Sequence, residues 1–152
     1  MMEVVQFRAE HYVDIIKGKN VWWLGKIDPL AIGKSYEAGI AYSGFWDGKL
    51  VAIAGIVCPW PGMGEAWAVL SIPDSPGCVL SINRNIRRIF GGMVRNMGLT
   101  RIQANVDAGS QIAIRWAEWL GFKQEGSIMR KYGPNGEDFL RLVMFPEENG
   151  NG

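Results

Sequence analysis

The stretch Ala113 to Gly126, AIRWAEWLGFKQEG, contains the pattern that decides the fold. Its first part continues a helix predicted from Ser110 to Leu120, in which the Ser110 hydroxyl can cap the free N–H groups of the first turn. Gly121 is typical of a helix end, because glycine readily takes the left-handed backbone conformation. Phe122 then begins a strand, so the stretch predicts a helix, a tight turn and a strand in direct succession.

Periodicity and turn residues predict the elements around this stretch. The predicted order is a strand (2–7), a helix (9–17), a helix (28–41), two strands joined by Asp47-Gly48 (43–46 and 49–57), a buried central strand (65–71), a long helix (78–97), a strand (101–106), the quoted stretch and a terminal hairpin (128–145). Pro59 and Pro61 are expected to break the second hairpin strand after residue 57. This order indicates a mixed α/β (α+β) sheet with helices on both faces.

The composition indicates one soluble domain. The 152 residues are 48% apolar, so residues 1–146 are predicted to form a single domain and residues 147–152 a flexible C-terminal tail. The 16 basic and 15 acidic residues give a net charge of +1, which argues against a nucleic-acid partner. No apolar run reaches the roughly 18 residues of a membrane helix, and the N-terminus lacks a secretion pattern. We therefore expect a cytoplasmic protein with no membrane partner.

Cysteine and histidine are too few for a metal centre. The two cysteines, Cys58 and Cys78, lack CxxC spacing, and His11 is the only histidine, so neither zinc nor a disulfide framework is predicted. Cys78, near a helix start, is either a nucleophile with a lowered pKa or a packing residue, and the packing interpretation is preferred because no histidine is near in sequence. His11 is interpreted as a solvated side chain.

The quoted segment resembles the GNAT superfamily of N-acetyltransferases. Members often read Asn-x-x-Ala-x-x-x-Tyr-x-x-x-Gly-Phe, and here Ala113 and Gly121-Phe122 match, while Ser110 and Ala117 replace the Asn and the Tyr. The resemblance covers roughly residues 65–126. It implies a mixed, mostly antiparallel sheet of six to seven strands with helices on both faces, and an enzyme that moves an acetyl group from acetyl-CoA to an amine.

The resemblance also implies where acetyl-CoA, as co-substrate, is held. A strand edge would bind the pantetheine arm and the start of the long helix would face the pyrophosphate, because a helix N-terminus presents backbone N–H groups to an anion. The residues concerned are Val69, Leu70 and Ser71 on the strand, and Gly77, Cys78 and Val79 on the helix. The family's phosphate loop, Arg/Gln-x-x-Gly-x-Gly/Ala, is matched here only by the small Ser81, since Pro76 occupies its first position.

Glu65 is the candidate general base. Many GNAT members hold a glutamate early on the corresponding strand, where a carboxylate can take a proton from the acceptor amine. The alternative is that Glu65 only flanks a loop at the strand start. Ala117 stands where the family's proton-donating tyrosine lies, and Tyr132 is either a substitute acid or, more simply, a cross-strand packing residue.

A second, looser resemblance leads to a rival hypothesis. The arrangement GEAWAVLS, IRWAEWLGF and MRKYGPNGEDF is similar to that of GNAT-like proteins encoded by bacteriophages. It implies a GNAT fold that has lost catalysis and acts in virion assembly or protein interaction, located in the host cytoplasm or the virion, with virion proteins or a second copy of the chain as partners. Pro76, Val79 and Ala117 favour this rival. Glu65, Gly121 and Phe122 favour the enzyme, although the last two also have a structural role.

Overall fold

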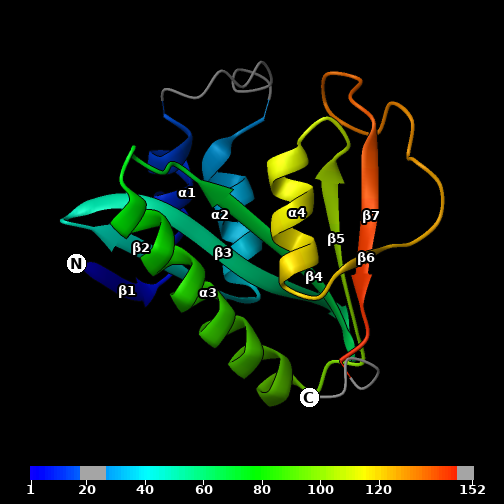
Figure 1. Cartoon of the computed structure of the whole chain (residues 1–152), viewed down its shortest axis with the longest axis horizontal. Helices are drawn as coiled ribbons and strands as arrows, with labels where there is room; N and C mark the ends of the chain where they lie inside the picture. The colour runs from blue at the N-terminus through cyan, green and yellow to red at the C-terminus, as the bar shows by residue number, and fades with distance from the viewer. Residues whose placement is uncertain (18–26, 147–152) are drawn as a thin grey trace. The chain divides into compact units, whose positions relative to one another are not determined.

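A computed structural model describes residues 1–17 and 27–146 of the chain. Its elements are β1 (Met2–Gln6), α1 (Ala9–Ile16), α2 (Pro29–Glu37), β2 (Ile40–Trp46), β3 (Lys49–Trp60), β4 (Met63–Leu70), α3 (Pro76–Met97), β5 (Arg101–Asp107), α4 (Gln111–Trp119), β6 (Lys123–Gln124) and β7 (Phe139–Met144). Within the described residues the strands form one sheet in the order β1-β2-β3-β4-β5-β7-β6 (Figure 1). The predicted fold class, a mixed and mostly antiparallel sheet with helices, is confirmed.

The chain groups into two compact units, which are described separately. The first unit contains Met1–Val57 and Trp67–Met93, and the second contains Cys58–Ala66 and Val94–Gly152. This grouping does not test the predicted single domain over 1–146, which stays a prediction. The predicted tail at 147–152 lies outside the described residues.

The first unit packs helices against both faces of its strands. On one face, Tyr12 and Ile15 of α1 cluster with Ala41 of β2 and Ile53 of β3, and α2 adds Tyr36. On the other face, α3 buries Cys78 and Ile82 against Val51 and Ala52 of β3. Figure 1 shows α1 beside α2, with α3 running along the opposite side of these strands. Neighbouring strand residues such as Ala52 and Ile53 point to opposite faces, which explains how one strand serves both clusters.

The Asp47-Gly48 turn forms as predicted. Both residues have positive φ, +50° at Asp47 and +84° at Gly48, as a type I′ hairpin requires. The turn sets the antiparallel pairing of β2 with β3, from Trp46 with Lys49 to Ile40 with Ile56.

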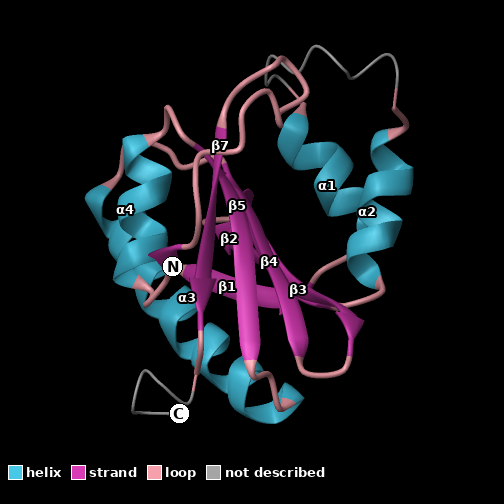
Figure 2. Cartoon of the chain, turned by 90° about the vertical axis from the view of Figure 1, so that its right-hand side faces the viewer, coloured by secondary structure: helices cyan, strands magenta, loops and turns pink. Residues whose placement is uncertain are grey.

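The second unit carries a polar face and an apolar face on the same strands. The first residues of β4 run parallel to β5, with Glu65 opposite Gln103, and β5 pairs antiparallel with β7. Ile102 and Leu142 are almost completely buried, while the alternate positions of β5 hold Arg101, Gln103 and Asn105. In this unit α4 lies against β5 (Figure 2).

Several predicted boundaries are corrected. The helix predicted to reach residue 41 ends at Glu37, and β2 begins at Ile40. Between them, Gly39 lies so close to the Ile56 carbonyl that only a residue without a side chain fits. β3 continues through Pro59 to Trp60, since proline breaks a strand only where its missing N–H would have bonded a neighbour. β4 is central in the sheet but not buried throughout, and Glu65 is exposed. The segment before β7 contains a single bridge, Met129 with Phe139, in place of a full hairpin strand.

Among residues 1–17 and 27–146, no helix combines the length and apolar character needed to cross a bilayer.

Candidate functional site

The six residues predicted to contact coenzyme A lie together in the first unit. Val69 and Leu70 end β4, Ser71 follows them, and Gly77, Cys78 and Val79 lie at the start of α3. Leu70 packs against the buried cluster that contains Cys78. The structure therefore brings the strand end and the helix start together, as a shared site requires.

Hydrogen bonds already occupy most N–H groups at the start of α3. Ser75 caps the helix, because its Oγ accepts from the Cys78 N–H (3.2 Å) and its carbonyl accepts from the Val79 N–H (3.1 Å). Pro76 has no N–H to offer. Within the described part of the chain, no hydrogen bond engages the N–H of the exposed Gly77. In this first turn, the Gly77 N–H is the group left for an anion.

Cys78 is completely buried and packs as an apolar residue. Burial raises the pKa of its thiol, and the Asp47 carboxylate raises it further. Both effects oppose formation of a thiolate, so the structure supports the packing interpretation of Cys78 and not the nucleophile.

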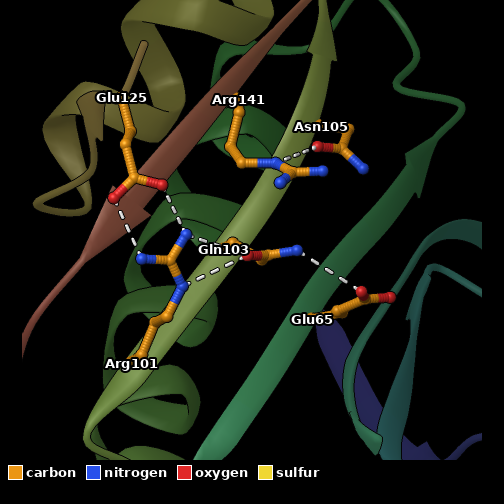
Figure 3. A network of polar contacts seen from close by, with 6 residues as sticks. All are labelled: Glu65, Arg101, Gln103, Asn105, Glu125 and Arg141. Carbon is orange, nitrogen blue, oxygen red and sulfur yellow. Dashed lines mark hydrogen bonds and ion pairs between the residues drawn. The ribbon is translucent and has the colours of Figure 1, made fainter. Parts of the chain in front are cut away.

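Glu65 lies in the second unit at one end of a row of polar contacts (Figure 3). Its Oε1 accepts a hydrogen bond from the Gln103 side-chain amide at 3.4 Å. The Gln103 Oε1 accepts from the Arg101 Nε (3.2 Å) and Nη2 (3.0 Å), and Arg101 also forms a two-bond pair with Glu125. Gln103 of β5 thus binds one oxygen of the Glu65 carboxylate, while the Glu65 side chain stays exposed to solvent.

Tyr132 combines packing with a polar contact. Its ring lies 5.3 Å from the Phe139 ring, and its hydroxyl accepts from the Asn105 Nδ2 at 3.0 Å. The tyrosine is 52% exposed. Both roles weighed for Tyr132 therefore stay open, since the ring packs as a strand neighbour and the hydroxyl is held in a fixed place.

His11 is not the solvated side chain that its helix position suggested, and the structure corrects that interpretation. Its Nδ1 accepts from the Arg8 N–H (3.1 Å) and lies 2.7 Å from the Oγ of the completely buried Ser43. The Arg8 N–H and the Ser43 hydroxyl thus both approach the same ring nitrogen of His11. The rings of Phe7 and Phe45 meet His11 edge-on.

His11 borders an open cavity of about 900 Å³ in the first unit. Arg8, Glu37 and Phe45 also line it, and the Glu37 carboxylate accepts from the Ala9 N–H at 2.5 Å. Nearby in the same unit, Trp67 stacks on Tyr36 with centroids 3.9 Å apart, and its buried Nε1 has no hydrogen-bond partner among the described residues. A buried donor without a partner is costly, and no contact of the described residues offsets that cost for Trp67.

Several solved structures that align with this chain are acetyltransferases. A dodecameric spermidine N-acetyltransferase from Vibrio cholerae aligns over 99% of this chain and 96% of its own, with a TM-score of 0.72 and 14% identity. An acetyltransferase of the GNAT family from Streptococcus pneumoniae aligns over 95% and 99% (TM-score 0.68, 14% identity). A ribosomal-protein-S5-alanine acetyltransferase from Vibrio fischeri aligns over 95% and 92% (TM-score 0.67, 15% identity).

The chain has the GNAT acetyltransferase fold. No protein-family model matches the sequence, and no curated protein matches it either. Fold similarity at 14–15% identity therefore exceeds what sequence comparison detects. The comparisons give no support to a bacteriophage origin.

Gly77 is the residue at the start of α3 with room and a donor for an anionic group. Gly77 offers an N–H and an exposed position, and a Cβ there would meet only the Trp46 ring and the Ser75 hydroxyl at 3.7–3.9 Å. The Ser71 N–H, in contrast, donates to the Val51 carbonyl at 2.8 Å and is not free for the pantetheine arm. Contact of Val69 and Leu70 with that arm stays a prediction.

Replacing Ser75 with alanine is expected to lower the free energy of unfolding by about 0.5–2 kcal/mol, because α3 loses its N-cap. Urea unfolding followed by circular dichroism measures the change. Ser127→Ala, at an exposed loop position, is the matched control and is expected to change stability by less than about 0.5 kcal/mol. Equal stability of the two variants would contradict the capping role of Ser75.

The Arg101–Glu125 pair is expected to make stability depend on acid pH. The hydrogen bonds from Arg101 hold the pKa of Glu125 below its ordinary value of 4.5. The ionised carboxylate therefore stabilises the fold above the unfolded-state pKa, and this contribution disappears as the pH falls through the lower folded-state pKa. Glu125→Gln should be less stable than the natural protein near neutral pH, and the difference should shrink as the pH falls below 4.5 and vanish below the folded-state pKa.

Thermal melting across this pH range measures the effect, with Glu118→Gln as the control, since no ion pair to Glu118 exists within the described residues. A stability difference between Glu125→Gln and the natural protein that stays constant down to strongly acid pH would contradict the assignment.

Two polar contacts, one in each unit, carry no sequence signal of their own. Gln103 is one of the alternating polar residues in RIQAN. It can contact Glu65 because the parallel pairing of β4 and β5 sets the two residues opposite each other. His11 contacts the buried Ser43, which is 32 positions away in the chain. Only the pairing of distant segments identifies either residue.

Proposed function

We propose that the chain is an acetyl-CoA-dependent N-acyltransferase that moves an acetyl group to an amine, with Glu65 as the general base. The observation that carries the proposal is the exposed Glu65 carboxylate, held through Gln103 early on β4 of a GNAT fold. A glutamate in this place has the reach and the charge to take a proton from an incoming amine.

Acetyl-CoA supplies the activated thioester. Glu65 accepts the proton that the acceptor nitrogen loses as the new N–C bond forms and the C–S bond breaks. The departing thiolate takes a proton from water, and Glu65 returns its proton to the solvent before the next turnover. Val69 and Leu70 line the pantetheine arm, and Gly77 donates its N–H to the pyrophosphate, beside Cys78 and Val79. Ala117 offers no acid where the family has its tyrosine, so positioning of the reactants supplies much of the rate.

The names of the structural neighbours guide the choice of acceptor. One acts on spermidine and another on an alanine of ribosomal protein S5. A screen should therefore include a polyamine and a peptide with an N-terminal alanine, with release of the coenzyme A thiol as the readout. We expect the chain to act in the cytoplasm, alone or as a homodimer.

Acetyl-CoA is expected to raise the melting temperature, because a ligand that binds only the folded state stabilises it by mass action. The measurement is thermal melting with millimolar acetyl-CoA, and ATP at equal concentration controls for general binding of polyanions. An unchanged melting temperature with acetyl-CoA would contradict the proposal.

A catalytically inactive GNAT-fold protein that binds another protein is the second candidate. The specific observation in its favour is the start of α3, where Pro76 has no N–H and Ser75 already binds the N–H groups of Cys78 and Val79. Such a chain could assemble with virion proteins if it is phage-encoded, or with a second copy of itself. An equal melting temperature with and without acetyl-CoA would favour this candidate.

A further inference from the structure

Gln103 is one of two polar side chains, with Ser43, that are buried among the described residues, and it is 6% exposed. A buried amide must satisfy both of its ends, and Gln103 does so with different partners. Its oxygen accepts two hydrogen bonds from Arg101, and its nitrogen donates to Glu65.

The chemistry of Arg101 fixes which end of the amide faces Glu65. A guanidinium has donors only, so it can bind the amide oxygen but not the amide nitrogen. The NH₂ group must then face the carboxylate, as Figure 3 shows. Rotation of the amide by half a turn would oppose donor to donor at Arg101 and acceptor to acceptor at Glu65.

Arg101 is itself held in place. Its Nη1 and Nη2 donate to the two carboxylate oxygens of Glu125 at 2.9 and 2.5 Å, and its guanidinium carbon lies 5.7 Å from the centre of the Phe145 ring. Such a two-bond pair is directional. Glu125 therefore fixes the orientation of Arg101, and Arg101 fixes that of the Gln103 amide. The oriented amide binds Glu65 from a defined direction.

We propose that Gln103, oriented by Arg101, positions the Glu65 carboxylate for proton transfer and directs its Oε2 to the acceptor amine. The proposal rests on the proposed role of Glu65 as general base. Gln103 binds Oε1, which leaves Oε2 as the oxygen free to take the proton. An arginine in direct contact would make the carboxylate a poorer proton acceptor, whereas a neutral amide orients it without adding a charge.

The kinetic test is a double-mutant cycle with the full chain. Gln103→Met keeps the length of the side chain and removes the amide, and it is expected to lower kcat by about 10- to 100-fold, with the acceptor KM changed less than about 3-fold. In a Glu65→Gln background the same substitution should lower kcat by less than about 2-fold, because Gln103 acts through Glu65. An equal loss in both backgrounds, or no loss in either, would overturn the proposal.

A second variant and a spectroscopic readout keep the proposal testable without activity. Arg101→Lys removes the two-bond contact that orients the amide, and it should lower kcat even if Gln103→Met fails to fold. In ¹⁵N spectra of the ligand-free protein, the Gln103 side-chain amide signals, assigned by their loss in Gln103→Met, should shift in Glu65→Ala and in Arg101→Lys. Gln103 amide chemical shifts that stay unchanged in Glu65→Ala overturn the positioning role, whether or not the protein transfers acetyl groups.

These readouts separate two failures. If the natural protein binds no acetyl-CoA but the amide signals respond to Glu65→Ala, the proposed function fails and the positioning contact stands. If acetyl transfer is measured but the double-mutant cycle is additive, the function stands and the positioning role of Gln103 fails.

Discussion

Glu65→Gln is expected to lower kcat for acetyl transfer by about 100- to 10,000-fold, the usual contribution of general acid–base catalysis. Glutamine keeps the shape of the side chain and its contact distance to Gln103 but cannot take a proton. Its Oε1 can still accept from the Gln103 amide, so the local structure should be preserved. The measurement is the release of the coenzyme A thiol at saturating acetyl-CoA and acceptor.

Two controls separate catalysis from binding and folding. The rise in melting temperature with acetyl-CoA should be the same in Glu65→Gln and in the natural protein, since Glu65 is not among the residues proposed to hold coenzyme A. Glu10→Gln, an exposed glutamate of α1, should leave kcat unchanged. A Glu65→Gln variant with the full rate would show that Glu65 only flanks the strand start.

Leu142→Ala is expected to lower the free energy of unfolding by about 2–5 kcal/mol, the range for large-to-small changes in a packed core. Leu142 is 1% exposed on β7, paired with Ala104 of β5 on one side and Gln124 of β6 on the other. Because β7 joins these two strands, a cavity at this position weakens the apolar face opposite the Gln103 row. Urea unfolding followed by fluorescence measures the loss.

Ile112→Ala is the matched control for this change. Ile112 is also a large aliphatic residue of the second unit but is 86% exposed, so its truncation should change stability by less than about 0.5 kcal/mol. A loss below about 1 kcal/mol for Leu142→Ala would contradict the core position of Leu142.

The features predicted well from sequence are those set by neighbours in the chain. The periodic apolar residues of α3 were predicted, as were the Ser110 cap of α4 and the Asp47-Gly48 turn. Each depends on residues within one or two turns of each other, so the local backbone preferences are sufficient. Glu65 was selected as a candidate base from its place at the start of a strand and a family resemblance.

The bounds of α2 and β3, and the contacts of Gln103 and His11, depend on residues that are far apart in the chain. The end of α2 depends on the close approach of Gly39 to Ile56, and the length of β3 on its pairing with β2. The roles of Gln103 and His11 depend on strand pairing and on a buried hydroxyl far away in the chain.

The sequence by itself determined the order of helices and strands, the GNAT resemblance and the candidate base Glu65. Only the tertiary structure decided that Gln103 binds Glu65 and is itself bound by Arg101. It also decided that Ser75 accepts hydrogen bonds from N–H groups at the start of α3. The physical reason is that helix and turn preferences act between near neighbours, whereas the partner of a buried polar group is set by which distant segments the sheet brings side by side.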